Sequence, residues 1–153
     1  METSFIRSFR RTTRRFERLS QILTNTCCKG VTVAQCHVLL DIEESVESTI
    51  VHLVHNLKLD KSTLSRTVEG LVRLGLVERK PHPTDRRSTL LRLSESGKKM
   101  CDEINREGDQ TYLRAFQRIP REKWGDVRIS FEVLVEAMME DHLAPSDDQA
   151  CCS

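Results

Sequence analysis

The stretch from Asp60 to Leu93, DKSTLSRTVEGLVRLGLVERKPHPTDRRSTLLRL, constrains the fold of this chain more than any other. Asp60 suits the cap of a helix, because its short side chain can accept hydrogen bonds from the backbone N–H groups of Ser62 or Thr63. The apolar residues that follow recur at spacings of three and four, which predicts a helix with one face docked on a core: Leu64, Val68, Leu71 and Val72. Gly75 marks the end of this helix, because a residue without Cβ adopts the left-handed conformation at little cost.

A β-hairpin is predicted directly after this helix. Residues 76–80 and 88–93 are rich in Leu, Val and Thr, and Pro81, Pro83 and Asp85 lie in the loop between them. The order of helix, turn and hairpin is that of a winged helix-turn-helix. In that arrangement the helix lies in the major groove of duplex DNA and the hairpin, or wing, lies beside it.

The polar face of the predicted helix and the hairpin carry residue types that contact nucleic acid. Arg66 can pair with a guanine edge through two hydrogen bonds, while serine and threonine hydroxyls can contact bases or phosphates. A basic loop can reach the phosphate backbone or a narrow minor groove. Any one of these residues alone is better explained as a solvated surface charge, but the ordered set favours DNA. We predict these DNA-binding residues: Lys61, Ser62, Thr63, Ser65, Arg66, Lys80, Arg86 and Arg87.

The residues from Leu57 to Met100, with the pattern LxLDKSTLSRxVxxLxxxGLVERxxxPxDRRSxxLxLSxxGxxM, resemble the winged-helix core of the MarR family of transcriptional regulators. The most specific parts are the Asp85-Arg86-Arg87 motif and the junction from Leu93-Ser94 to Gly97, and weaker similarity extends over residues 1–143. The resemblance implies an obligate homodimer, acting as a repressor on a pseudo-palindromic operator in double-stranded DNA. One recognition helix would occupy each major groove.

The hydrophobic periodicity predicts a mainly α-helical chain with a small β-hairpin wing, which is a winged helix-turn-helix plus a helical dimerisation region. Helices are expected over about residues 2–24, 32–44, 49–57, 61–74, 94–118 and 120–143. We expect a single MarR-like domain over residues 1–143, with the winged-helix core at 32–93. Residues 1–24 and 94–143 should form the dimerisation helices, because their apolar stripes need a partner, and residues 144–153 should form a flexible tail.

The charge of the chain, +1 in total, is distributed unevenly. Residues 58–99 hold eleven lysines and arginines against five acids, a net charge of +6, whereas residues 100–153 have a net charge of −6. Basic charge is thus concentrated where DNA phosphates would be neutralised, and the acidic third should face away from DNA. There is no run of eighteen apolar residues and no secretory pattern at the N-terminus, so we expect a cytoplasmic protein without membrane association.

Four of the six cysteines form two adjacent pairs, Cys27-Cys28 and Cys151-Cys152. Because neighbouring thiolates suit a soft, thiophilic ion, we predict that these pairs bind As(III), Hg(II) or Cd(II) as an effector that releases the protein from DNA. No cofactor is expected to be required. Oxidation is a competing hypothesis, because Lys29 can lower the pKa of the neighbouring Cys28. A small aromatic or anionic effector, which the family resemblance implies, is a third. Cys36, by contrast, fits a small buried hydrophobe.

The chain lacks the motifs that an enzyme of a common class would need. GxSxG, HExxH, a P-loop and GxGxxG are all missing, and the five histidines are scattered. We therefore predict that the protein is not an enzyme. The alternative from another class is a protein-interaction module that uses the winged helix without binding DNA.

Overall fold

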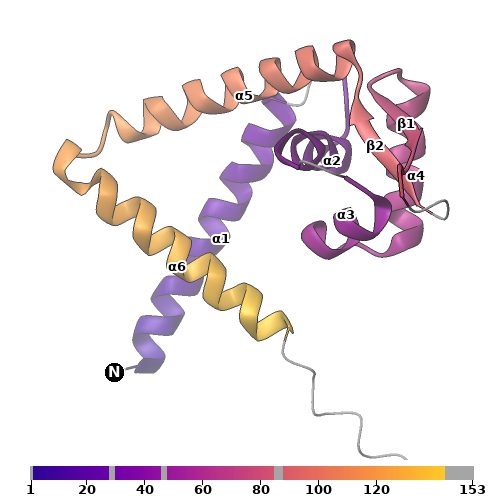
Figure 1. The fold of residues 1–153 in the computed structure, drawn as a ribbon. Coiled ribbons are helices and arrows are strands. Elements are labelled where there is room, and N and C mark those ends of the chain that lie inside the picture. Colours follow the sequence, from indigo (N-terminus) through magenta and orange to yellow (C-terminus); the bar gives the residue numbers. More distant parts are fainter. Residues whose placement is uncertain (1, 28–29, 46–47, 85–87, 144–153) are drawn as a thin grey trace, which may run out of the picture. The chain divides into compact units, whose positions relative to one another are not determined.

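The computed structural model describes residues 2–27, 30–45, 48–84 and 88–143 (Figure 1). Along the chain the elements are α1 (Glu2–Cys27), α2 (Val33–Glu44), α3 (Ile50–Leu57), α4 (Lys61–Arg73), β1 (Val77–Pro81), β2 (Thr89–Leu93), α5 (Glu95–Phe116), the 3-10 helix η1 (Arg121–Lys123) and α6 (Trp124–Leu143). This mainly helical chain with one antiparallel hairpin confirms the predicted fold class. The chain divides into two compact units, residues 1–111 and 112–153, so α5 contributes to both.

The core of the first unit is built from α2, α3, α4, the hairpin and the first half of α5, which contributes Cys101 and Ile104. On α4, the predicted apolar face is confirmed, because Leu64, Val68 and Leu71 are 0% exposed. Leu39 of α2 and Leu53 of α3 are equally buried. Figure 1 shows the hairpin next to α4, and residues of α4 and β1 are in contact. This core holds α4 with its other face available to solvent.

Threonine side chains fix where α2 and α3 begin. Thr32 and Gln35 form a reciprocal capping box: the Thr32 hydroxyl accepts from the Gln35 N–H at 3.2 Å, and the Gln35 side chain accepts from the Thr32 N–H at 2.9 Å. The Thr49 hydroxyl accepts from the His52 N–H at 3.2 Å. Lys58 ends α3 with a φ of +51°, a left-handed conformation that residues with a Cβ rarely adopt. The left-handed conformation of Lys58 sets the tight turn that leads into α4.

The wing is a two-stranded sheet in which Val77 faces Leu93 and Pro81 faces Thr89. The segment before α3 adds to its edge, because the Leu91 N–H donates to the Ser48 carbonyl at 2.8 Å. Ser48 itself is 2% exposed. The sheet is therefore held on the core through β2.

The second unit is a helical hairpin whose turn is organised by Trp124. Its indole N–H donates to the Ile119 carbonyl at 3.1 Å, and its ring packs edge-on against Phe116 with 5.3 Å between ring centroids. The sequence predicted that the last helix begins at Pro120. Instead, residues 121–123 form a 3-10 turn and the α-helix begins at Trp124, because this tryptophan closes the turn back onto α5.

Large apolar side chains are exposed along α1 and along the helices of the second unit. In α1 they are Phe5, Ile6, Phe9, Phe16, Leu19 and Ile22. In the second unit they are Tyr112, Leu113, Val127, Ile129, Phe131, Val133, Val135, Met138 and Met139. Among the described residues, no helix is both long and apolar enough to cross a membrane.

Candidate nucleic-acid interface

Asp60 organises the first turn of α4. Its carboxylate accepts from the Thr63 N–H at 2.9 Å and from the Ser62 hydroxyl at 2.6 Å. These hydrogen bonds, with that from Ser62 contributing most, hold the pKa of Asp60 well below its usual range. Since the Ser62 hydroxyl donates its hydrogen within the cap, only its lone pairs remain for a DNA group. This serine is therefore suited to accept from a base amino group rather than to donate to a phosphate.

The other side chains that we predict to face DNA lie mostly on the accessible side of α4. Lys61, Thr63 and Arg66 are exposed like Ser62, while Ser65 is half-buried. Because these residues fill the first two turns, they lie beside the positive end of the helix dipole and its free backbone N–H groups. Together they form a polar and basic surface of the kind that contacts DNA. Their contacts with DNA stay a prediction.

The first helix of the motif, α3, is tied to α2 through side chains. The Asn56 amide donates to the Asp41 carboxylate at 3.0 Å and lies 3.3 Å from His52 Nε2. Because the amide nitrogen is a donor, His52 Nε2 is the acceptor in this contact. The Ser45 hydroxyl also donates to Asp41, at 3.4 Å. The orientation of α3 is thereby fixed relative to the core helix α2.

The junction between the wing and α5 explains why Ser94 and Gly97 form a recognisable motif. The Ser94 hydroxyl donates to the Gly75 carbonyl at 2.6 Å and accepts from the Gly97 N–H at 3.0 Å. The Ser94 N–H donates to the Leu76 carbonyl at 3.0 Å. Gly75 has a φ of +70°, as its place at the helix end predicted. One serine therefore joins the end of α4, the start of the wing and the start of α5.

An ion pair that the sequence did not reveal connects the wing to α4. Arg79 Nη2 of β1 lies 3.0 Å from Glu69 Oε2 of α4, and both side chains are about half exposed, at 45% and 50%. Helical or strand periodicity relates residues within one element, so it gave no signal for this pair. Lys80, a predicted DNA contact, is exposed and lies 3.5 Å from Glu78 on the same strand. Contact of Lys80 with a phosphate would therefore compete with this carboxylate. Arg86 and Arg87 lie outside the described residues.

The buried cysteines lie in the core and the predicted metal ligands lie elsewhere. Cys36 is 4% exposed, as predicted, and Cys101 is 0% exposed. Burial, with smaller contributions from the charges of Glu43 and Asp102, raises the pKa of the Cys101 thiol to about 12. Of the predicted ligands, Cys28, Cys151, Cys152 and the side chain of Cys27 lie outside the described residues. Among the side chains that the structure does describe, no group of three His, Cys, Asp or Glu is arranged to hold a metal ion.

Comparison with known sequences places the similarity in the winged-helix region. Residues 29–88 match the model of the MarR family. The multiple antibiotic resistance protein MarR of Escherichia coli is 36% identical over 75 residues, which are 49% of this chain and 52% of that protein. The chain thus matches about half the length of this curated relative.

Comparison with solved structures extends the similarity to most of the chain. A MarR transcriptional regulator from Methanosarcina mazei has a TM-score of 0.76 at 23% identity, covering 86% of this chain and 96% of that one. A mutant of Escherichia coli MarR complexed with operator DNA has a TM-score of 0.65 at 23% identity, covering 80% and 91%. These likenesses show the fold, and the match to the family model is confined to residues 29–88. The winged-helix region of this chain, residues 29–88, is thus similar to the MarR family of transcriptional regulators.

Proposed function

We propose that this protein is a transcriptional repressor that binds double-stranded DNA as a homodimer on a pseudo-palindromic operator. The observation that carries the proposal is the accessible, polar and basic face of the first turns of α4. The opposite, apolar face of this helix is buried in the core and holds the polar face towards solvent. Residues 58–99 add a net charge of +6 on which phosphates can be neutralised. The operator complex of Escherichia coli MarR is an example of DNA binding by a protein of this fold.

The exposed apolar residues of α1 and of the second unit support the homodimer. Six large apolar side chains of the single helix α1 are exposed, from Phe5 at 66% to Phe9 at 38%. Contiguous apolar surface of this kind marks an interface. A twofold dimer would present two copies of α4 to half-sites about one helical turn apart, roughly 10 base pairs.

The test of the proposal is an electrophoretic mobility shift with the DNA upstream of the protein's own reading frame. The chain should shift this DNA at low salt, and Arg66→Ala combined with Arg87→Ala should abolish the shift while the dimer persists in light scattering. Arg106→Ala combined with Arg114→Ala, which removes two arginines from α5, is the matched control and should leave the shift unchanged. A wild-type chain that never shifts this DNA at low salt contradicts the proposal.

We infer further that the effector is a thiophilic ion, As(III), Hg(II) or Cd(II), bound by Cys27, Cys28, Cys151 and Cys152. The support is chemical: two adjacent pairs of soft sulfur ligands favour such ions over hard cations. The burial of Cys36 and Cys101 leaves these four as the candidate ligands among the six cysteines. In this proposal, ion binding releases the repressor from its operator.

The compound that releases the protein from DNA distinguishes a thiophilic ion from the competing effectors. As(III) or Hg(II) should release wild-type protein from DNA, whereas replacement of all four cysteines by serine should preserve DNA binding and remove the response. Replacing Cys36 by serine is the control and should keep the response. Release by peroxide that dithiothreitol reverses would instead favour oxidation of Cys28. Release of the four-serine variant by an aromatic carboxylate would favour a small aromatic effector.

A protein-interaction module without DNA binding is the alternative from another class. It requires that α4 and the wing dock on a protein, for which the described residues offer a polar and basic rather than an apolar surface. We assign no catalytic activity, because the family consists of transcriptional regulators. A DNA-binding regulator of this kind would act in the cytoplasm.

A further inference from the structure

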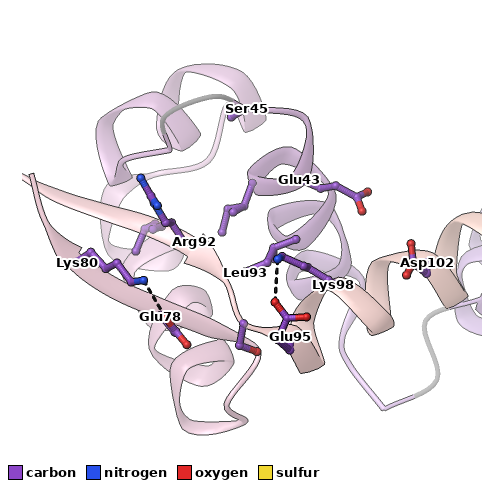
Figure 2. A pocket seen from close by; sticks show the side chains of 12 residues that line it. Glu43, Ser45, Glu78, Lys80, Arg92, Leu93, Glu95, Lys98 and Asp102 are labelled. Atoms are coloured by element: carbon purple, nitrogen blue, oxygen red, sulfur yellow. Dashed lines mark hydrogen bonds and ion pairs between the residues drawn. The ribbon is translucent and has the colours of Figure 1, made fainter.

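A pocket opens where the end of α2, the base of the wing and the first turns of α5 meet (Figure 2). Its volume is about 730 Å³, within the range of sites that hold small molecules. All the residues that line it belong to the first unit. Among the described side chains that we predict to contact DNA, only Lys80 lines this pocket. The pocket is therefore a different place on the molecule from the exposed face of α4.

The charges that line this pocket are unevenly distributed. Lys80, Arg92 and Glu78 come from the two strands, and because Lys80 Nζ lies 3.5 Å from Glu78 Oε2, the strand side keeps the net positive charge of Arg92. Glu43 and Asp102, both negative, come from α2 and α5. Figure 2 shows the two cations on the strand side and the two carboxylates on the helix side. A ligand with one charge only would be attracted at one end and repelled at the other.

The charges between the two ends neutralise each other. Lys98 Nζ lies 2.8 Å from Glu95 Oε1, and this pairing raises the pKa of Lys98 and lowers that of Glu95. Arg92, in contrast, forms neither an ion pair nor a hydrogen bond with any described residue. Its guanidinium has its donors available for an anionic group.

Among the described residues, the carboxylates on the helix side of the pocket, Glu43 and Asp102, are not neutralised in the way that Glu95 is. The Glu43 carboxylate accepts from the neutral Asn105 amide at 2.9 Å, which leaves its charge uncompensated. Both Glu43 and Asp102 raise the pKa of the buried Cys101 thiol, after the larger effect of burial. Both carboxylates therefore act on the same neighbouring group, on the helix side of the pocket.

The surface between the two ends is partly apolar. Ile42 of α2 and Leu91 of β2 are buried core residues whose surface also lines the pocket, and the half-buried Leu93 lies beside them. A short hydrocarbon segment would be removed from water on contact with these side chains, which is favourable in proportion to its area.

We propose that this pocket binds a small zwitterion, with its anionic group on Arg92, its ammonium group on Glu43 and Asp102, and an apolar segment between them. Each end would make charge-assisted hydrogen bonds, the stronger kind available to a ligand in water. The separation of the two charges selects the length of the ligand. This inference does not depend on DNA binding or on the cysteines.

The test is isothermal titration of the full chain with linear amino acids that differ only in chain length: γ-aminobutyrate, 6-aminohexanoate and 8-aminooctanoate. One length should bind best. The matching compounds with a single charge, the alkanoate and the alkylammonium of that length, should each bind at least about tenfold more weakly. If either single-charge compound binds as well as the zwitterion, or if no amino acid of the series binds below about 10 mM, the proposal is wrong.

Variants that neutralise one charge at either end of the pocket test whether the amino acid binds there. Arg92→Gln and Asp102→Asn should each weaken binding of the best amino acid by at least about tenfold. Arg106→Gln and Glu103→Gln change the same charges at exposed positions of α5 outside the pocket, and should leave the affinity unchanged. Equal effects of pocket and control variants would overturn the assignment.

A charge swap distinguishes recognition from loss of structure. Arg92→Glu alone and Asp102→Arg alone should each abolish binding. The triple variant Arg92→Glu, Asp102→Arg and Glu43→Gln should restore it to within about threefold of wild type, because the charges of the two ends are then reversed and the zwitterion can bind in the opposite direction. Thermal melting of all three variants checks that they fold. Failure of the folded triple variant to bind would contradict the proposed separation of charges.

Discussion

Gly97 lies directly against the main chain of Leu76, where the wing begins. A Cβ built on Gly97 would overlap the Leu76 carbonyl oxygen, which cannot move away because the Ser94 N–H donates to it at 3.0 Å. The absence of a side chain at this one residue therefore allows α5 to start close to the end of α4. Gly108, in the same helix, has no heavy atom within 4 Å of its ideal Cβ position.

Gly97→Ala should lower the free energy of unfolding by about 2 kcal/mol, because backbone must shift to admit the methyl group. Gly108→Ala is the matched control and should raise it by about 0.5–1 kcal/mol, the difference in helix propensity between the two residues. The measurement is urea denaturation at one protomer concentration, since dimerisation affects apparent stability. Equal stability of the two variants would show that the junction tolerates a side chain at position 97.

Cys101 should be unreactive in the folded protein. Its pKa is raised to about 12, so at pH 8 only about one thiol in ten thousand is ionised, and its side chain is 0% exposed. We expect that iodoacetamide at pH 8 leaves Cys101 and Cys36 unlabelled until the protein is denatured, as read by mass spectrometry of peptides. Because the folded pKa is raised, the stabilisation by the neutral thiol is complete below the ordinary value of 9.0 and is lost as the pH rises towards 12. Labelling of Cys101 in native protein as fast as in denatured protein would contradict its burial.

At the scale of elements, the sequence predicted each helix and the hairpin because their signals are local. The threonine and aspartate caps and the three-and-four spacing of Leu64, Val68 and Leu71 act within one turn or one helix. What joins the elements was not predictable: the Arg79–Glu69 pair and the hydrogen bonds of Ser94 connect residues whose proximity only the folded chain creates. The start of α6 was misplaced for the same reason, since Trp124 closes its turn on residues of another helix.

The same distinction holds for the candidate site. The exposed face of α4 followed from the position of the apolar face opposite to it, so Lys61, Thr63 and Arg66 lie where the sequence predicted. The commitment of the Ser62 hydroxyl to Asp60 and of Lys80 to Glu78 depends on side-chain conformation, which spacing does not specify. The charges of the pocket come from four elements, and no motif in the sequence brought them together.

The cap of α4 should be required for its first turns, which carry the predicted DNA contacts. At pH 7, Asp60→Ala should lower the midpoint of thermal unfolding by a few degrees, whereas Asp60→Asn should stay close to wild type, because asparagine is an equally good cap. Since the pKa of folded Asp60 is lowered, its stabilisation is present above the ordinary value of 3.8 and is lost as the pH falls through the lowered pKa. Any advantage of wild type over Asp60→Asn should therefore shrink as the pH falls below 3.8. Circular dichroism melting across this pH range measures both effects, and an unchanged midpoint for Asp60→Ala at pH 7 would contradict the role of the cap.

At the scale of the whole molecule, charge and apolar surface are divided between different parts of the chain. The segment with net charge +6 contains α4 and the wing, while the segment with net charge −6 contains most of α5 and all of the second unit. The exposed apolar side chains lie outside the basic segment, apart from Leu74 at the end of α4. DNA binding and self-association would thus use separate surfaces, and operator affinity should depend on both.

Leu19 of α1, which is 58% exposed, tests this dependence. Leu19→Glu should shift the protein towards monomer in light scattering, because a charge at the centre of an apolar interface must be desolvated. Gln21→Glu adds the same charge to an exposed position two residues away and should leave the dimer intact. Because each protomer supplies one α4, the Leu19→Glu monomer should bind the full operator at least about tenfold more weakly, although its own DNA-binding surface is unchanged. A monomeric Leu19→Glu variant that keeps wild-type operator affinity would show that a single winged helix suffices.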